Sequence, residues 1–288
     1  ADALRFTLVT GNSPGNDLRF SEEKVSASRN FANKIWNAAR FILMNIEGKD
    51  IDCALPKKLY TSDKWILNRF NNVTAAVTEN LEKFELGMAV SKLYDFIWDD
   101  FCDWYIELAK IRMNGADEES ADSARRVLVW TMSNTLKLLH PFMPYITEEI
   151  WQTLPHDGEA LIVAKWPEYD EALSFPQEAK DLENVMALIR AIRTRRNEMN
   201  VPPSKKAHIY IDTAHPAPYE EASEFIARLA YGSKVEIGMG FDVQGAVTAV
   251  TDDAKALLPM DDLVDKAAET ARLNKELANA QKQLDTVK

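Results

Sequence analysis

The chain has 288 residues, of which 46% are hydrophobic and only 10 are glycine. This composition is typical of a folded, mainly helical chain of about two domains rather than a disordered one. The 34 basic and 45 acidic residues give a formal net charge of −11. Such a charge argues against indiscriminate binding to nucleic acid, because the long-range field repels phosphate. It does not exclude a local basic site for one structured RNA.

Cysteine content and hydropathy indicate the cellular setting. Cys53 and Cys102 fit no zinc spacing and no disulfide framework, so we expect a reducing, cytoplasmic setting. No apolar run approaches the roughly 18 residues that cross a bilayer, and no signal peptide is visible, so we expect no membrane association. The first residue is Ala1 rather than an initiator Met, and we expect the chain to be a fragment of a longer protein.

The first predicted helix follows a short apolar segment at 4–10 and a turn at 11–16. Ser21 is a favourable N-cap, the two acidic residues after it suit the first turn, and Gly48 predicts the end of the helix. One side of the helix repeats apolar residues at the spacing of a buried stripe. These residues are Phe31, Ile35, Ala38 and Ile42.

The opposite side of this helix has an unusual composition. A water-facing side normally carries Glu and Lys, whereas this one carries amides, basic residues and a large ring. We call these residues the polar stripe: Asn30, Asn33, Lys34, Asn37, Arg40 and Phe41. Amides and Arg read the edges of bases, and an exposed ring stacks on an unpaired base. The stripe therefore favours a site for unpaired nucleotides; the alternative is an ordinary solvated side with Phe41 turned into the core.

Four more helices are predicted from apolar residues spaced by threes and fours. They lie at about 62–84, 85–113, 117–140 and 145–154. Pro141 stops one of them and Pro144 starts the next. Helix 85–113 has two apolar edges, which is typical of a helix with neighbours on several sides. These elements predict a helical bundle, from which the irregular stretch 155–176 leads out.

The pattern changes near residue 175. The predicted order is helix 177–199, strand 207–211, helix 218–231, strand 234–237 and strand 247–251. This order predicts a small α+β domain. A basic cluster lies where the first of these helices ends, and in so acidic a chain it is a candidate for contacts with RNA phosphates. Its members are Arg190, Arg193, Arg195, Arg196, Lys205 and Lys206. The alternative is a solvated helix surface.

The C-terminal segment repeats apolar residues with 4-3-4-3 spacing. These residues are Leu273, Leu277, Ala280, Leu284 and Val287. The spacing predicts one strand of a coiled coil. A seam of about fifteen residues is not stable alone, so we expect a partner helix in another chain or beyond Lys288.

No constellation in the sequence predicts catalysis. The four histidines are scattered, without Cys or acid at ligand spacing, and no P-loop, zinc signature or nucleophile motif occurs. An acidic cluster on helix 85–113 fits a solvated edge better than a cation site. It consists of Asp99, Asp100, Asp103 and Glu107. We therefore expect no catalytic residue, metal or cofactor in this chain.

Several segments, in collinear order, resemble class I aminoacyl-tRNA synthetases. Residues 1–6 resemble the segment after the KMSKS loop, and residues 140–151 resemble a helix junction in the anticodon-binding bundle of the valine, isoleucine and leucine enzymes. Further segments are similar, more narrowly, to the bacterial valyl-tRNA synthetase family. They are 29–41, 93–110, 201–206 and, as the entry to a coiled-coil arm, 271–277.

The resemblance implies an organisation and a parent enzyme. The parent would be a monomeric, cytoplasmic enzyme that joins valine to tRNA(Val) with ATP and Mg²⁺, with its catalytic and editing domains before Ala1. This chain would be an inactive part of it, without a cofactor of its own. Its parts would be a connector at 1–20, an anticodon-binding bundle at 21–175, a small α+β domain at 176–260 and the start of a tRNA-binding arm at 261–288.

The resemblance also gives roles to residues. Valine tRNAs share A and C at the second and third anticodon positions, and Asn meets adenine bidentately. The implied anticodon-reading residues are Arg19, Asn33, Asn37, Arg40 and Phe41. Weaker candidates for contacts with the tRNA backbone are Asn30, Lys34, Arg190, Arg193 and Arg196. Two alternatives stay open: the same module of an isoleucyl- or leucyl-tRNA synthetase, and a non-enzymatic helical scaffold that dimerises through its coiled-coil end.

Overall fold

The computed structural model describes residues 1–11 and 19–263. The predicted coiled-coil seam at 273–287, and all but the first residue of the predicted turn at 11–16, lie outside the described residues. Within the described part of the chain, no helix is long and apolar enough to cross a membrane. The chain divides into two compact units, Ala1–Ala179 and Lys180–Lys288, and the division falls inside one helix.

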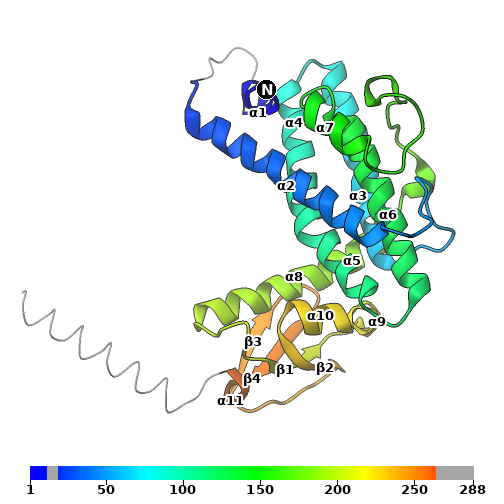
Figure 1. Ribbon diagram of the computed structural model, residues 1–288. Helices are drawn as coiled ribbons and strands as arrows, with labels where there is room; N and C mark the ends of the chain where they lie inside the picture. Colours follow the sequence, from blue (N-terminus) through cyan, green and yellow to red (C-terminus); the bar gives the residue numbers. More distant parts are fainter. Residues whose placement is uncertain (12–18, 264–288) are drawn as a thin grey trace, which may run out of the picture. The chain divides into compact units, whose positions relative to one another are not determined.

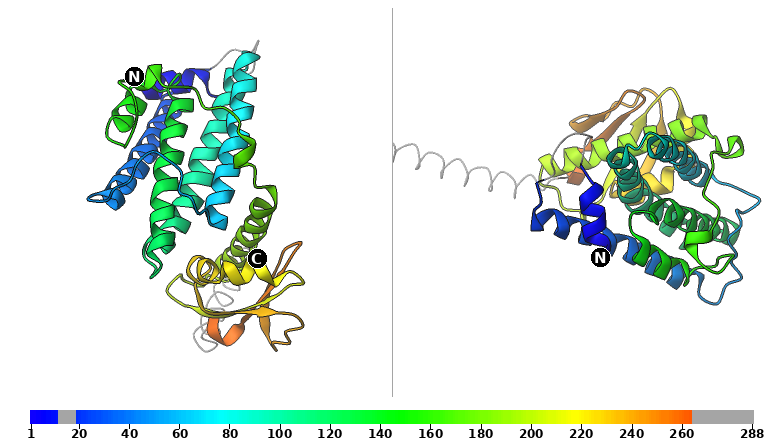
Figure 2. Two further views of the ribbon diagram at one scale, coloured as in Figure 1. Left: turned by 90° about the vertical axis from the view of Figure 1, so that its right-hand side faces the viewer. Right: turned by 90° about the horizontal axis from the view of Figure 1, so that it is seen from above.

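The first unit is a helical bundle (Figure 1), and the predicted mainly helical fold class is confirmed. Its α-helices are α1 (Asp2–Val9), α2 (Glu22–Ile46), α3 (Thr61–Glu82), α4 (Leu86–Asp95), α5 (Ile106–Met113), α6 (Glu118–Leu139) and α7 (Pro144–Trp151). A π-helix, η1 (Phe96–Tyr105), joins α4 to α5, and two short 3-10 turns, η2 (Leu161–Val163) and η3 (Glu171–Leu173), follow α7. Helix α6 packs against both α2 and α3, and Figure 2 shows the bundle from two further sides.

Helix α1 was not predicted, because its apolar residues form too short a segment for a helical period to be visible. The structure packs it onto α2 within the bundle. Phe6 is buried with its ring 4.9 Å from that of Phe31, which in turn lies 4.8 Å from the ring of Tyr94. The hydroxyls of Thr7 and Ser28 are 2.7 Å apart. These contacts attach the N-terminal half of α2 to α1 and to α4.

A buried polar network joins α3, α5 and α6. A carboxylate oxygen of Asp63 lies 2.5 Å from the Arg112 guanidinium, and both residues are buried. The Tyr105 and Ser123 hydroxyls donate to Asp63 at 2.7 and 2.9 Å, and Arg112 also donates to the Ser120 hydroxyl at 2.9 Å. Each buried charge therefore has several partners, without which burial would be strongly unfavourable. The sequence indicated Asp63 only as a residue of the helix start.

The second unit is a small α+β fold, of the class predicted. After α8 (Pro176–Glu198) come β1 (Ala207–Asp212), α9 (Pro216–Glu221), α10 (Ser223–Leu229), β2 (Gly232–Gly238), β3 (Ala246–Val250), β4 (Lys255–Pro259) and α11 (Met260–Leu263). The strand order is β2-β1-β4-β3, with β1 and β2 parallel and the other pairs antiparallel. Strand β4 was not predicted, because three successive residues, Ala256 to Leu258, are buried and no alternation marks it.

Candidate nucleic-acid interface

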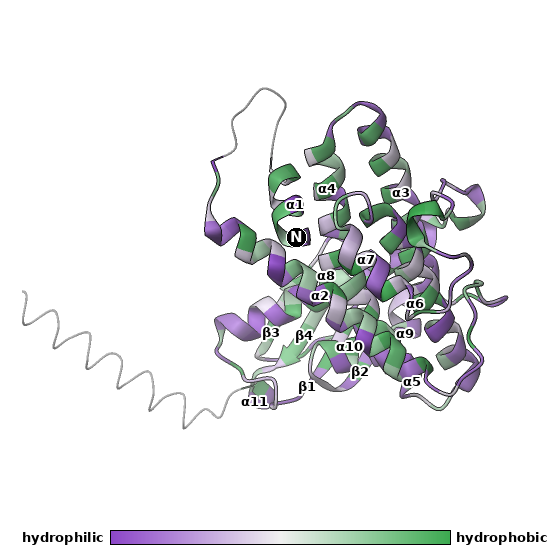
Figure 3. Ribbon diagram, turned by 45° about the horizontal axis from the view of Figure 1, so that its top comes forward, coloured by the Kyte–Doolittle hydropathy of each residue, from purple (hydrophilic) through white to green (hydrophobic). Residues whose placement is uncertain are grey.

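Helix α2 carries the predicted site, and its start and its core side follow the prediction. The Ser21 hydroxyl accepts a hydrogen bond from the backbone N–H of Lys24, and two glutamates occupy the first turn, where carboxylates are favourable. The predicted core residues are all buried: Phe31, Ile35, Ala38 and Ile42. Figure 3 shows the resulting alternation of hydrophilic and hydrophobic residues along the helix. Burial of this apolar side fixes which side chains of α2 face solvent.

One exposed surface of α2 brings together five side chains. We call this surface the open face of α2: Asn33, Trp36, Asn37, Arg40 and Met44. Their spacing of three and four residues places them on one side of the helix. The side chains of Asn33, Asn37 and Arg40 make no hydrogen bond or ion pair with any described residue. Three of the five predicted anticodon-reading residues are therefore exposed together, with unused donors and acceptors.

Two other predicted residues of the first unit are also exposed. Asn30 is exposed one turn before Asn33, and Arg19 is exposed ahead of the helix. Both are in the same unit as the open face. Their side chains likewise have no hydrogen bond or ion pair with a described residue. Asn30 therefore stays available as a contact at the N-terminal side of the open face, and Arg19 is exposed ahead of the helix.

Lys34 is held against the π-helix η1 and is partly exposed. Its ammonium lies 2.6 Å from a carboxylate oxygen of Asp103 and 3.7 Å from the centre of the Trp98 ring. Residues five apart in an α-helix lie about 140° apart around the axis, whereas the i→i+5 pattern of a π-helix brings them to one side. The π-helix η1 therefore lets Trp98 and Asp103 engage the same cation. Cys102, the residue before Asp103, is also in η1, and burial raises the pKa of its thiol to about 12.

Phe41 lies at the flank of α2 rather than on the open face. It is half-buried, and the Lys110 ammonium lies 5.2 Å from the centre of its ring. Lys110 in turn pairs with Glu107 at 2.5 Å. The exposed ring on the open face is Trp36, which the sequence analysis missed. The signal was present in the sequence, because Trp36 follows Asn33 by three positions and precedes Arg40 by four.

The structure excludes Arg196 as a contact for an external phosphate. Only 2% of this residue is exposed, and its guanidinium donates to the carbonyls of Pro202 and Lys205. Its guanidinium carbon also lies 5.4 Å from the centre of the Tyr231 ring. Burial lowers the pKa of Arg196 because no carboxylate compensates the charge. Its burial contradicts the predicted phosphate contact, and one of its guanidinium nitrogens holds the chain that follows α8.

Two neighbouring arginines are also engaged within the second unit. Arg193 is half-buried and donates to the carbonyl of Leu229 at 2.6 Å. Arg195 pairs with Glu198 at 2.8 Å and donates to the carbonyl of Thr248. These contacts attach the end of α8 to α10 and β3. Three arginines of the basic cluster at the end of α8 therefore have structural partners, and Arg190 and Lys206 are further members of the cluster that are exposed.

Three of the four acidic residues of the cluster on helix 85–113 are paired with basic neighbours. Asp100 lies 2.8 Å from Arg69, and Asp103 and Glu107 hold Lys34 and Lys110. Among the described residues, no group of three His, Cys, Asp or Glu side chains is placed to hold a metal ion. These carboxylates therefore act as counter-ions within the bundle.

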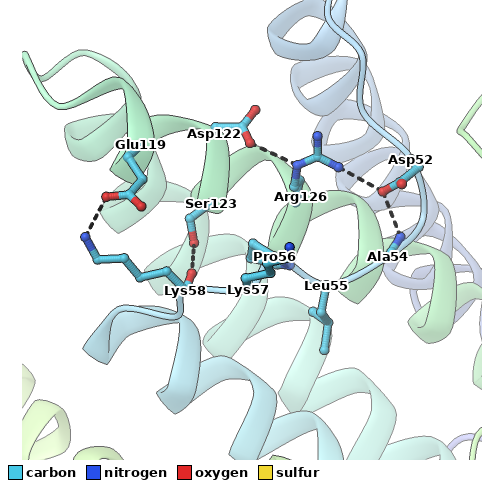
Figure 4. A pocket seen from close by; sticks show the side chains of 10 residues that line it. All are labelled: Asp52, Ala54, Leu55, Pro56, Lys57, Lys58, Glu119, Asp122, Ser123 and Arg126. Carbon is cyan, nitrogen blue, oxygen red and sulfur yellow. Dashed lines mark hydrogen bonds and ion pairs between the residues drawn. The ribbon is translucent and has the colours of Figure 1, made fainter.

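A pocket in the first unit lies between the loop 52–58 and α6 (Figure 4). Its charged side chains, Lys57 excepted, are paired within the pocket itself. Arg126 lies 2.9 Å from both Asp52 and Asp122, and Lys58 lies 2.6 Å from Glu119. Because opposite charges meet inside it, this pocket presents no surplus of either sign to a charged ligand.

The first unit is a helical bundle with amides, Arg and Trp exposed on one helix, and the second unit is a small mixed sheet with its helices. Residues 63–211 match the family described as the anticodon-binding domain of tRNA ligase. The chain belongs to this family, which confirms the resemblance that its motifs indicated.

The chain is similar over nearly its whole length to bacterial valine–tRNA ligases. It is 47% identical over 281 residues to the enzyme of Clostridium acetobutylicum, 46% over 294 to that of Listeria monocytogenes and 43% over 292 to that of Bacillus subtilis. These matches cover 96–100% of this chain and 32–33% of the relatives. The chain thus spans about a third of their length, and the matches that cover all of it include α2.

Proposed function

We propose that this chain is the tRNA-recognising part of a valine–tRNA ligase, and that the open face of α2 reads the anticodon of tRNA(Val). The similarity to valine–tRNA ligases supports the choice of amino acid over the isoleucine and leucine alternatives. The observation that carries the assignment of the site is the set of unpartnered amide and guanidinium groups on the open face. In a chain with a net charge of −11, such groups favour contacts with bases over general attraction of phosphate.

The side chains have distinct roles in this proposal. Asn33 and Asn37 present a carbonyl and an amide that meet the edge of an adenine with two hydrogen bonds. Arg40 donates to acceptors of the neighbouring base or its phosphate. Arg19 approaches from the segment before α2. Phe41 contributes an apolar wall from the flank, and Asn30 is the contact to the sugar–phosphate backbone.

The backbone contacts proposed for other residues are ranked by their partners. Lys34 already neutralises Asp103 and therefore ranks below Asn30. In the second unit Arg190 ranks first by its exposure alone, because Arg193 is half-buried against a carbonyl and Arg196 is buried.

The parent enzyme, in this proposal, ligates valine to tRNA(Val) in the cytoplasm with ATP and Mg²⁺. The described residues of this chain do not fit a magnesium site, because no suitable group of ligands is brought together. We therefore assign no step of the ATP chemistry to this chain. Its contribution is recognition of the tRNA.

Binding of valine tRNA by variants of α2 tests the proposal. Asn37→Ala removes one bidentate partner of a base, and we expect affinity to fall about 5- to 150-fold, the equivalent of about 1–3 kcal/mol. The matched control is Asn72→Ala on α3, because Asn72 is also an exposed amide on a helix of the first unit. Isoleucine tRNA, titrated in parallel, should bind the parent chain more weakly than valine tRNA.

Two results would contradict the proposal. One is that Asn33→Ala and Asn37→Ala, both folded, bind valine tRNA as tightly as the parent chain. The other is that the parent chain does not bind valine tRNA at low salt, where electrostatic contributions are largest.

A further inference from the structure

We propose that Trp36, rather than Phe41, is the ring on which an RNA base stacks at the open face of α2, with Met44 as a second apolar contact. This inference rests on the proposed function and identifies a residue that positions the bound RNA. It concerns the surface defined above and requires no contribution from the second unit.

Exposure distinguishes Trp36 from the other tryptophans. The chain has seven, and the other six are buried or half-buried. Trp36 is 39% exposed and Met44, two turns further along the same side, is 72% exposed. Together they place apolar surface on the solvent-facing side of α2, and a stacked base would remove part of that surface from water.

The Trp36 indole also has no partner of its own among the described residues. No hydrogen bond, ring contact or cation–π contact engages it. By contrast, Trp98 stacks on Tyr94 at 5.6 Å and receives the Lys34 ammonium, and Trp166 donates its indole N–H to Thr78 at 3.0 Å. Trp36 thus keeps both an exposed ring surface and an unused N–H donor.

Phe41 is less suited to stacking, although the sequence favoured it. Its ring is half-buried and lies within 5.2 Å of the Lys110 ammonium. A base on that ring would have to displace the lysine or share the ring with it. Trp36 requires no such rearrangement.

The position of Trp36 suits a base that is read by the neighbouring amides. It lies three residues after Asn33 and four before Arg40, so the three side chains are neighbours on the helix surface. A base stacked on the indole would present its edge to Asn33 or Asn37. Stacking would then supply affinity without sequence preference, and the amides would supply the choice of base.

The helix holds this platform in place before RNA binds. Ile35 and Ala38, on either side of Trp36 and Asn37 in sequence, are buried in the bundle. Lys34 ties the same turn to η1 through Asp103 and Trp98. A preorganised platform loses little conformational entropy on binding, which favours affinity.

Substitution of Trp36 in the full 288-residue chain tests the inference. The probe is an RNA hairpin that carries the anticodon arm of valine tRNA. We expect Trp36→Ala to weaken binding about 5- to 150-fold. Trp36→Phe should restore most of the affinity and Trp36→Leu should not, because only Phe offers a π surface. Tyr145→Ala on α7 is the control, since Tyr145 is an aromatic residue of the same unit that is 67% exposed.

Abasic nucleotides locate the stacked base. With the parent chain, removal of that base should weaken binding, whereas with Trp36→Ala the same removal should have almost no further effect. This coupling should occur at one loop position only, because a ring stacks on one base at its exposed surface. The cycle measures the interaction itself and is insensitive to small changes in stability.

The outcomes separate this inference from the proposed function. If Asn37→Ala weakens binding but Trp36→Ala changes it less than twofold, or if Leu substitutes as well as Phe, the stacking role is overturned and anticodon reading stands. If Phe41→Ala couples to an abasic position and Trp36→Ala does not, the role belongs to Phe41. If neither Asn37→Ala nor Trp36→Ala affects binding, the proposed function fails as well.

Discussion

The open face of α2 and the basic end of α8 have similar compositions and different structural roles. In both, Arg and amide side chains follow one another at helical spacing. On α2 these groups have no partners among the described residues, because the apolar side of the helix is the one that packs. At the end of α8 the guanidiniums reach carbonyls and carboxylates of the second unit. Polar side chains mark a recognition site only where the fold does not already use their hydrogen-bonding capacity.

The largest expected effect comes from the buried member of the α8 cluster. Arg196→Ala removes the donors to the carbonyls of Pro202 and Lys205 and leaves a cavity beside Tyr231. We expect the free energy of unfolding of the second unit to fall by about 2–4 kcal/mol. Because all seven tryptophans precede residue 180, hydrogen exchange of the β1 and β2 amides is the appropriate measurement.

Arg195→Ala is the matched control for this substitution. Its ion pair with Glu198 is exposed, so the change in stability should stay within about 0.5 kcal/mol. The structural role given to the end of α8 would be contradicted if Arg196→Ala left amide exchange unchanged and weakened RNA binding instead.

A smaller effect should come from the exposed arginine of α2. Arg40→Gln should leave unfolding almost unchanged, because Arg40 has no partner among the described residues. RNA binding should weaken, and the slope of log affinity against log salt should become shallower by about one. Titration of valine tRNA at several salt concentrations measures both quantities.

Arg193→Gln is the counterpart of this substitution on α8. Since the Arg193 guanidinium is held by the carbonyl of Leu229, the salt slope of this variant should match that of the parent chain. Equal slopes for the Arg40→Gln variant and the parent would show that Arg40 contacts neither phosphate nor its counterions.

The sequence predicts the parts of this fold that depend on local patterns. The start of α2 at Ser21 and its core side follow from capping and helical spacing, and Pro144 correctly begins α7. The π-helix η1 escapes prediction because its apolar residues still step by threes and fours. Strand β4 escapes because its burial on both faces removes the alternation that marks a strand.

The composition of the open face was predicted in part, for a related reason. Spacing places Asn33, Asn37 and Arg40 together, because all three lie opposite the core. It does not show that Phe41 faces Lys110, or that Arg196 turns inward to carbonyls that follow α8. These are tertiary partners, and the one-dimensional pattern contains no information about them.

The smallest expected effect distinguishes Lys34 from its neighbours in the polar stripe. Lys34→Met keeps the apolar stem of the side chain but removes the ion pair with Asp103 and the cation over Trp98. Since both contacts are partly exposed, we expect a loss of about 1 kcal/mol in the free energy of unfolding of the first unit. Urea unfolding followed by tryptophan fluorescence reports this unit.

The salt slope of RNA binding should not change, because the charge of Lys34 is already neutralised by Asp103. If Lys34→Met weakens RNA binding, Asp103→Asn should weaken it equally, because that substitution removes the same ion pair and keeps the lysine. A shallower salt slope in Lys34→Met alone would move Lys34 from the structural group to the phosphate contacts.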